Sequence, residues 1–226
     1  MYNKKRILAI IPARAGSRRI KNKNIILFKG KPMIIKTLDV AKKCKYIDKI
    51  IVSTDSKKIQ NICKLGGVYT PFLRKDSYNE YSSVQQATLS AINQAEEFFG
   101  KFDVVIQLMA NCPLRKIKTL NLSIKNFFKK KIKSQISFFD YGFANPWWAH
   151  KIKNKKIIPL NKKKLFKRSQ DLEKLYCPTG SIWISNIKTL KKYKTFYSPN
   201  YSYFIMDFDE AIDIDSFEDL SLAKRL

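Results

Sequence analysis

Apolar and polar positions in this chain form two kinds of segment, short apolar runs and longer stretches with helical spacing. A strand covered on both faces is apolar at nearly every position, so the short runs predict buried strands. The predicted strands are residues 7–11, 47–54 and 104–109. Apolar residues three or four positions apart predict amphipathic helices. The predicted helices are residues 33–44, 56–65 and 84–99.

This alternation of strand and helix predicts an α/β fold, with a doubly wound, mostly parallel, Rossmann-like sheet. Ligands of such sheets bind beyond the carboxyl ends of the strands. We therefore expect the functional residues directly after positions 11, 52 and 108, where the sequence is rich in polar and charged side chains.

The pattern changes between residues 137 and 175, where aromatic residues crowd together and a lysine-rich polar stretch follows. This change predicts an inserted arm or meander. Residues 180–185 then predict a strand that returns to the core, and residues 211–226 a strand followed by a terminal helix. The chain has no internal repeat and no linker rich in Pro, Gly or Ser. We expect one domain over residues 1–226 with an inserted element at 137–175.

The composition is that of a globular protein, with 226 residues and 45% hydrophobic content. A chain of this length can bury a core that needs neither disulfides nor a structural metal. No apolar run approaches the roughly 20 residues that cross a bilayer, and the first residues do not resemble a secretory signal. The cysteines are scattered without a CxxC pair, which indicates free thiols in a reducing cytoplasm. We expect a cytoplasmic protein without a membrane partner.

The formal net charge of +27 raises the question of nucleic-acid binding. The excess is mostly lysine spread along the whole chain, in short runs such as 129–131 and 162–164. No zinc-finger, basic-zipper or RNA-binding aromatic motif accompanies it. We interpret the charge as a solvated lysine-rich surface and do not expect a nucleic-acid partner. A non-catalytic basic protein that binds nucleic acid remains the alternative.

The loop that follows the first predicted strand, residues 12–24, has the strongest functional signal. Gly16 allows a tight turn whose backbone N–H groups point at an anion. The side chains suited to a triphosphate are Arg14, Ser17, Arg18, Lys23 and Asn24. The glycine spacing is that of neither a Walker A loop nor a dinucleotide-binding turn. The loop is predicted to bind phosphates; the alternative is a basic loop exposed to solvent.

The run Ile10-Ile11-Pro12-Ala13-Arg14-Ala15-Gly16-Ser17, with Lys23-Asn24 after it, resembles the N-terminal signature of CMP-N-acylneuraminate synthetases. Further similar segments follow in order along nearly the whole chain. They are residues 28–32, 52–55, 72–74, 82–83, 112–115, 168–172, 180–184 and 213–215. The resemblance implies a cytidylyltransferase that transfers CMP from CTP to the anomeric hydroxyl of a nonulosonic acid, an acidic nine-carbon sugar, and releases pyrophosphate. It also implies a Mg²⁺ cofactor, a homodimer, and a role in making surface glycoconjugates.

By this resemblance, one set of residues binds the nucleotide. It comprises Arg14, Ala15, Gly16, Ser17, Arg18, Lys23, Asn24, Arg74 and Ser83. Arg14, Arg18 and Asp215 are implied to be catalytic. Arg18 stands where the family usually has lysine, which exchanges a compact ammonium for a planar fork. For Ser83 the alternative is a helix N-cap before Val84, and the two roles are compatible.

Asp213 and Asp215 are the candidate metal ligands. They lie two residues apart in a predicted strand, so both carboxylates face one side. Two carboxylates together with phosphate oxygens and water are a usual way to hold Mg²⁺. Asp207 and Asp209 have the same spacing and are the competing pair. We prefer Asp213 and Asp215 because isoleucines flank them.

On the sugar side the chain departs from the family. Met109 stands where relatives carry a glutamine, and a thioether cannot make the same hydrogen bonds. Asn111 is a substitute candidate. Further candidate sugar-binding residues are Trp147, Trp148, Arg168 and Gln170. The tryptophans suit an acyl or methyl pocket, with core packing as the alternative, and a guanidinium can hold the sugar carboxylate with two parallel hydrogen bonds. The departure makes a legionaminate or pseudaminate type of sugar at least as good a candidate as N-acetylneuraminate, and a related eight-carbon sugar is a further alternative.

Overall fold

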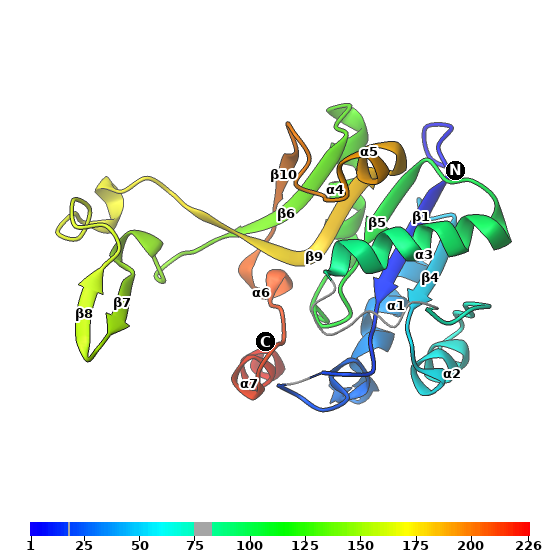
Figure 1. Cartoon of the computed structure of the whole chain (residues 1–226), viewed down its shortest axis with the longest axis horizontal. Coiled ribbons are helices and arrows are strands. Elements are labelled where there is room, and N and C mark those ends of the chain that lie inside the picture. The colour runs from blue at the N-terminus through cyan, green and yellow to red at the C-terminus, as the bar shows by residue number, and fades with distance from the viewer. Residues whose placement is uncertain (18, 75–82) are drawn as a thin grey trace.

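A computed structural model describes residues 1–17, 19–74 and 83–226 of the chain. Its centre is a six-stranded sheet in the order β10-β6-β9-β5-β1-β4 (Figure 1). The strands are β1 (Ile7–Pro12), β4 (Lys49–Ser53), β5 (Val104–Gln107), β6 (Ser134–Asp140), β9 (Tyr176–Asn186) and β10 (Ser202–Ile205). β1 pairs in parallel with β4 and β5, and β10 with β6, whereas β9 runs antiparallel between β5 and β6. The predicted mostly parallel sheet is confirmed.

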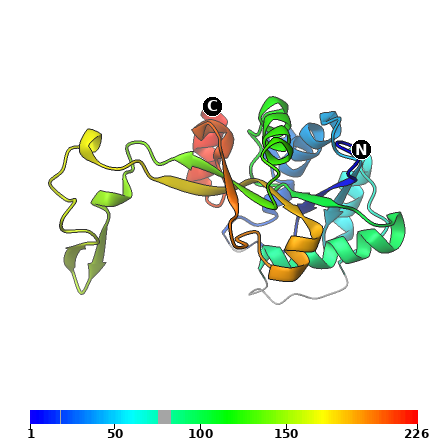
Figure 2. The same ribbon diagram turned by 90° about the horizontal axis from the view of Figure 1, so that it is seen from above.

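Helices cover both faces of the sheet (Figure 2). They are α1 (Met33–Lys43), α2 (Lys57–Leu65), α3 (Val84–Phe99), α4 (Ile117–Lys129) and α5 (Ile187–Tyr193). Residues of α1, α2 and α4 share one buried hydrophobic cluster with the sheet, and residues of α3 and α5 share another. The doubly wound arrangement is therefore confirmed.

Strand β1 shows how the sheet is held between the two layers. Ile7 and Ile11 belong to the cluster on the α1 face, and Leu8 and Ile10 to the cluster on the α3 face. All four side chains are fully buried. Burying an aliphatic side chain of this size contributes about 1.5–3 kcal/mol. The continuous apolar run thus holds β1 between both helical layers and brings its carboxyl end to one edge of the sheet.

The chain leaves this core as an arm, residues 141–175, which starts and ends at the paired residues Asp140 and Tyr176. The arm projects from the body in both views (Figures 1 and 2). Its tip is a hairpin of β7 (His150–Lys153) and β8 (Lys156–Pro159). Two 3₁₀ turns flank the hairpin, at Pro146–Trp148 and Ser169–Asp171. The expected insertion began at residue 137, but residues 137–140 still belong to the β6–β9 ladder.

The C-terminal region differs from the prediction. It has two helices, α6 (Phe208–Ala211) and α7 (Phe217–Arg225), joined by irregular backbone instead of the predicted strand. This segment forms no β ladder; its Ile214 N–H donates to the Asn111 carbonyl at 2.9 Å. Ile212 and Ile214 are nevertheless buried, in a third cluster that includes Phe28. The prediction that these isoleucines are buried is confirmed, but the prediction that the segment is a strand is wrong.

The remaining elements are short. The 3₁₀ turn Lys23–Ile25 leads into a small hairpin of β2 (Leu27–Phe28) and β3 (Lys31–Pro32). Across the described ranges, no helix combines the length and apolar character that crossing a membrane requires. The four cysteines are free thiols, as expected, and Cys44, Cys63 and Cys112 are buried.

Candidate functional site

Three segments meet at the carboxyl edge of the sheet. The loop after β1 carries Arg19 and Lys23, the turn after β5 carries Asn111, and the irregular segment before α7 carries Asp213 and Asp215. The β1 and β5 turns lie side by side because their strands pair in parallel. The hydrogen bond from Ile214 to Asn111 then attaches the C-terminal segment to the same edge.

Asp215 is the charged centre of this cluster. Lys23 donates to its Oδ1 and Arg19 to its Oδ2, so each carboxylate oxygen faces a cation. Burial alone raises the pKa of Asp215, but the hydrogen bond and charge of Lys23, aided by Arg19, outweigh it, and the net pKa is lowered. Asp215 is therefore ionised at neutral pH and holds Lys23 and Arg19 in place beside the sheet edge.

Asn111 connects the two aspartates. Its side-chain amide donates to Asp213, and lies 3.3 Å from both Asp215 Oδ1 and the Ile214 carbonyl. Because one amide reaches both carboxylates, the two acids face the same side, as their spacing predicts. Asn111 is itself buried. The residue proposed from the sequence to contact sugar is thus a residue that positions the acidic pair.

Asp213 has an unusual environment for a carboxyl group. Taken as a whole residue, Asp213 is exposed to solvent. Its carboxyl group nevertheless has many protein atoms close around it. This burial, followed by the negative charge of Asp215, raises its pKa to about 6, while Lys23 opposes the shift. Two carboxylates that repel each other in this way form a site that a divalent cation would stabilise. The described residues contain no group of three or more His, Cys, Asp or Glu side chains that could hold a metal. Carboxylate oxygens are hard ligands, so the pair is chemically suited to Mg²⁺ with phosphate and water completing the shell.

The predicted phosphate loop borders this cluster. Asn24 donates to the Arg14 carbonyl at 3.0 Å, and the Ala15 N–H donates to Asp55 at 2.8 Å. These bonds fix the loop between β1 and the end of β4. Arg14 is exposed, and within the described residues its guanidinium has neither a hydrogen bond nor an ion pair. It is therefore free to meet an anion.

Two further residues of the predicted loop need comment. Gly16 does not have a left-handed backbone, and a Cβ added there would meet nothing within 4 Å, so its role in a phosphate-binding turn stays a prediction. The open space around Gly16 leaves room for a ligand beside Ser17, which is partly exposed. Arg18 lies outside the described residues.

Arg74 and Ser83 lie at the ends of neighbouring elements. Arg74 donates to Ser53, to the backbone carbonyl at 2.7 Å and to the hydroxyl at 3.2 Å, at the carboxyl end of β4. Ser83 is the N-cap of α3, and with Gln86 it forms a reciprocal capping box. The N-cap alternative for Ser83 is therefore observed. Its nucleotide role stays a prediction.

Met109 and Asp213 both lie close to Gly180 of β9. A Cβ added to Gly180 would lie 2.7 Å from Met109 Cγ and 3.5 Å from Asp213 Oδ2. The Met109 side chain can therefore cover β9 only because residue 180 is glycine. Met109 is partly exposed, so it presents an apolar surface beside Asp213.

Arg115 lies beneath this surface and was not among the candidates. It is buried, and its guanidinium donates to the Ser181 hydroxyl and the Met109 carbonyl, both at 3.1 Å. Burial lowers its pKa to about 10, so it is still protonated at neutral pH. Arg115 thus joins the ends of β5 and β9. Asp55, which accepts a hydrogen bond from the Ala15 N–H, and Arg19, which pairs with Asp215, were also not among the candidates. A partner far along the chain has no local sequence signal.

The four remaining sugar-site candidates lie on the arm. Trp147 and Trp148 donate their indole N–H groups to backbone carbonyls of the arm, at Glu173 and Lys167. Arg168 forms an ion pair with Asp171 at 2.9 Å, and Gln170 lies in the same 3₁₀ turn. Within one chain the arm projects away from the carboxyl edge (Figure 1). The structure therefore does not bring these residues to the Asp213 site of their own chain.

Asp207 and Asp209, the competing acidic pair, lie at the start of the short helix α6. Asp207 is the N-cap residue of α6, and Asp209 forms an ion pair with Lys116 at 3.1 Å. Only Asp213 and Asp215 of the two pairs share the edge with the phosphate loop. The preference for Asp213 and Asp215 agrees with this geometry.

A strand edge with a phosphate-type loop and paired carboxylates defines a nucleotidyltransferase-like site, and comparison with known proteins gives the family. The cytidylyltransferase family model matches residues 8–176. The chain belongs to the cytidylyltransferase family and is an enzyme of the nucleotidyltransferase class.

Two curated relatives match nearly end to end. The chain is 34% identical to CMP-N,N'-diacetyllegionaminic acid synthase from Legionella pneumophila, over 98% of this chain and 96% of the relative. It is 32% identical to a pseudaminic acid cytidylyltransferase from Campylobacter jejuni, over 97% of this chain and 95% of the relative. A solved CMP:2-keto-3-deoxy-manno-octonic acid synthetase, complexed with CTP, has a TM-score of 0.73 over 97% of both chains. At 14% sequence identity, this structural similarity is evidence for a shared fold alone.

Proposed function

We propose that this enzyme transfers CMP from CTP to the anomeric hydroxyl of a nonulosonic acid and releases pyrophosphate. The observation that carries the proposal is the pair Asp213 and Asp215, held by Asn111 opposite the cations of the β1 loop. A nucleotidyl transfer needs positive charge at the triphosphate and carboxylates for a metal, and both are at one strand edge. The relatives, which are named for pseudaminic and legionaminic acid, supply the class of sugar.

In this proposal the β1 loop binds the triphosphate. Arg14 is exposed and Ser17 partly exposed, and there is open space at the Cβ position of Gly16, whereas the Ala15 N–H is already bound to Asp55. Lys23 pairs with Asp215 in the free protein and is in position to contact the leaving pyrophosphate. Alignment and charge neutralisation account for most of the rate, as in other phosphoryl-type transfers.

Asp213 and Asp215 would hold Mg²⁺, which neutralises phosphate charge when it is bound. Asn111 fixes the direction of both carboxylates through its amide. Arg115 keeps Met109 and Ser181 in register, so the apolar surface of Met109 stays beside Asp213. We assign that surface to a deoxy or methyl part of the sugar, where a hydroxyl-binding amide would be less suitable.

The arm suggests that the site is completed by a second copy. Phe143 and Phe166 on the arm are 96% and 92% exposed, and Ile152 and Ile157 of the hairpin are also exposed. Apolar side chains displayed together on a projecting segment are typical of an interface. We propose a homodimer in which the arm brings Trp147 and Arg168 to the partner's carboxyl edge. A cytoplasmic location stays a prediction, supported by the four free thiols.

The test is pyrophosphate release from CTP with a panel of nonulosonic acids and an eight-carbon acid, for the wild type and Asp215→Asn. The proposal expects release with one or a few nine-carbon acids, reduced roughly 100-fold or more in the variant. Asp207→Asn is the matched control, because Asp207 is exposed and its side chain makes no capping hydrogen bond at the start of α6. Turnover of the eight-carbon acid alone would correct the substrate. No turnover with any sugar and nucleotide, from folded protein, would refute the proposal.

The dimer is tested separately by light scattering after size-exclusion chromatography. We expect a dimer for the wild type and a monomer for Phe143→Ser/Phe166→Ser, whose single domain should still show cooperative melting. A monomeric wild type would contradict the arm's role and leave the transfer reaction unaffected as a proposal.

A further inference from the structure

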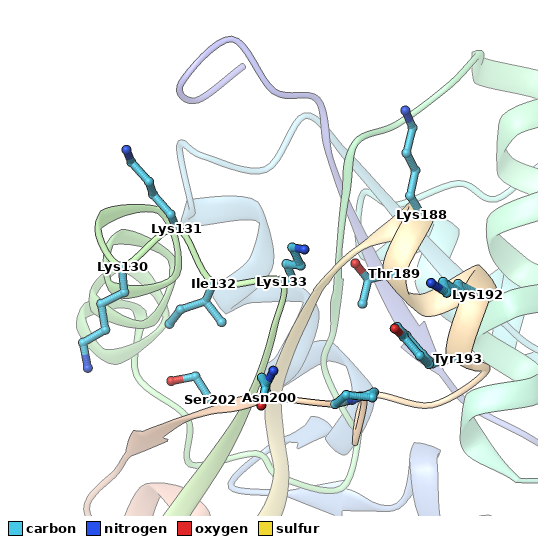
Figure 3. Close-up of a pocket in the computed structure, with 11 residues that line it drawn as sticks. Lys130, Lys131, Ile132, Lys133, Lys188, Thr189, Lys192, Tyr193, Asn200 and Ser202 are labelled. Carbon is cyan, nitrogen blue, oxygen red and sulfur yellow. The ribbon is translucent and has the colours of Figure 1, made fainter.

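A basic hollow lies at the edge of the sheet where β6 and β10 begin, opposite the carboxyl edge that carries the acidic pair. It is formed where β6 and β10 begin and where α5 follows β9 (Figure 3). The carboxyl ends of the parallel strands, with Asp213 and Asp215, point to the opposite edge. The hollow has a volume of about 550 Å³, which is in the range of small-molecule sites. It is thus separate from the site described above.

The lining of this hollow is strongly positive. Five lysines contribute to it, and no acidic residue does. They are Lys130, Lys131, Lys133, Lys188 and Lys192. None of the five forms an ion pair with an acid within the described ranges of the chain. The acids nearest in the fold have other partners: Glu96 pairs with Lys191 and Lys101, and Asp103 with Lys5.

Neutral hydrogen-bonding groups lie among these charges. Thr189, Tyr193, Asn200 and Ser202 also line the hollow. Figure 3 shows Lys133 and Lys192 on either side of Thr189, while Lys131 and Lys188 extend outward at the rim. A concave surface lined by charges of one sign concentrates ions of the opposite sign, so the hollow favours an anion. Ammonium groups act as point charges for phosphate oxygens.

We propose that this hollow binds a small, multiply charged phosphate chain, either free polyphosphate or the polyphosphate of a nucleotide. The concave shape and the hydroxyl and amide donors fit a compact anion. A nucleic-acid strand would need a basic track that continues beyond the hollow together with bases stacked on aromatic rings. The proposal is independent of the transfer reaction, because its residues lie at the opposite edge.

The first experiment is calorimetric titration of tripolyphosphate into metal-free protein at low salt. The wild type should bind it at two sites, the carboxyl edge and the hollow. Lys133→Gln/Lys192→Gln should lose the second site or bind there at least about tenfold more weakly, and still catalyse pyrophosphate release at the wild-type rate. Lys43→Gln/Lys45→Gln, with the same charge change at exposed positions at the end of α1, should behave as the wild type does.

A parallel arm separates the two sources of the phosphate chain. Equal affinity for tripolyphosphate and ATP indicates recognition of the chain alone. Tighter binding of ATP, lost in Tyr193→Ala, indicates a nucleotide. If tripolyphosphate binding weakened equally in the hollow variant and in the control variant, the effect would be one of net charge, and the proposal would be overturned. Tripolyphosphate binding that is the same in the wild type and in Lys133→Gln/Lys192→Gln, or binding of RNA without a saturable tripolyphosphate site, would overturn it as well.

Discussion

Lys23 and Asp215 lie 192 positions apart in the sequence and form an ion pair in the fold. The pair joins the phosphate loop to the C-terminal segment, and it keeps a cation at the strand edge before any nucleotide arrives. A side chain held in this way needs little reorganisation when the substrate binds. Lys23 therefore has two roles that mutation should separate.

Replacing Lys23 by glutamine should raise the KM for CTP and lower kcat, with a loss in kcat/KM of roughly 10²-fold. The ammonium proposed to meet the pyrophosphate is lost, and Asp215 keeps Arg19 as a cationic partner. Steady-state kinetics with varied CTP measure the change. Lys21→Gln, an exposed position in the same loop, is the control and should stay near the wild-type value. Equal losses in both variants would indicate a general charge effect.

Met109→Gln should change which sugar is used. The amide restores the donor and acceptor that relatives carry, at the cost of the apolar surface beside Asp213. We expect kcat/KM for the preferred sugar to fall by about 10-fold or more, and the ratio to N-acetylneuraminate to shift in favour of the latter. The KM for CTP should be unchanged, since Met109 is assigned to the sugar. Unaltered sugar preference would contradict the assignment.

Gly180→Ala should destabilise the protein by about 1–3 kcal/mol. The added Cβ would lie 2.7 Å from Met109 Cγ, closer than unbonded carbons approach. Denaturant unfolding measures the loss, and Met109→Ala should restore part of it in the double variant because the clash is removed. Gly16→Ala is the control, with open space at its Cβ position. A neutral Gly180→Ala would mean that Met109 moves aside at no cost.

The stability of the metal-free enzyme should depend on Asp213 between pH 3.8 and about 6. Its native pKa is raised, so in this window the native state binds more protons than the unfolded state, and stability falls as pH rises. Asp213→Asn should lack this decline. Melting temperatures measured with a chelator at several pH values give the comparison, and parallel curves for the two proteins would contradict the raised pKa.

The fold was largely predictable because its signals are local. The apolar run of β1 needs only composition, and the bounds of α3 follow from Ser83 before it and Gly100 after it. Helix α4 was not predicted, although Leu120, Ile124 and Phe127 have helical spacing and are buried. The strand expected around Asp213 failed because strand formation depends on a neighbouring strand, which the sequence does not specify.

The candidate site was predictable in part for the same reason. Asp213 and Asp215 were chosen from the family resemblance and the isoleucines beside them, since Asp207 and Asp209 have the same spacing. The β1 loop was recognised from its position after a buried strand and from the same resemblance. The partners that complete the site come from distant segments: Arg19 at Asp215, and Asp55 at the Ala15 amide. Arg115 stands in a recognised motif, but its burial beneath Met109 depends on the packing of β5 against β9.

The pairing of Asp140 with Tyr176 has a consequence for how the chain is organised. The arm leaves and re-enters at one point of the ladder, so the core does not need it to join distant strands. Closing a shorter connection at that point costs little conformational entropy, and a two-residue hairpin turn can join antiparallel neighbours. The arm is in this sense a module: evolution could lengthen, exchange or delete it, and alter assembly or sugar choice, without refolding the nucleotide-binding core.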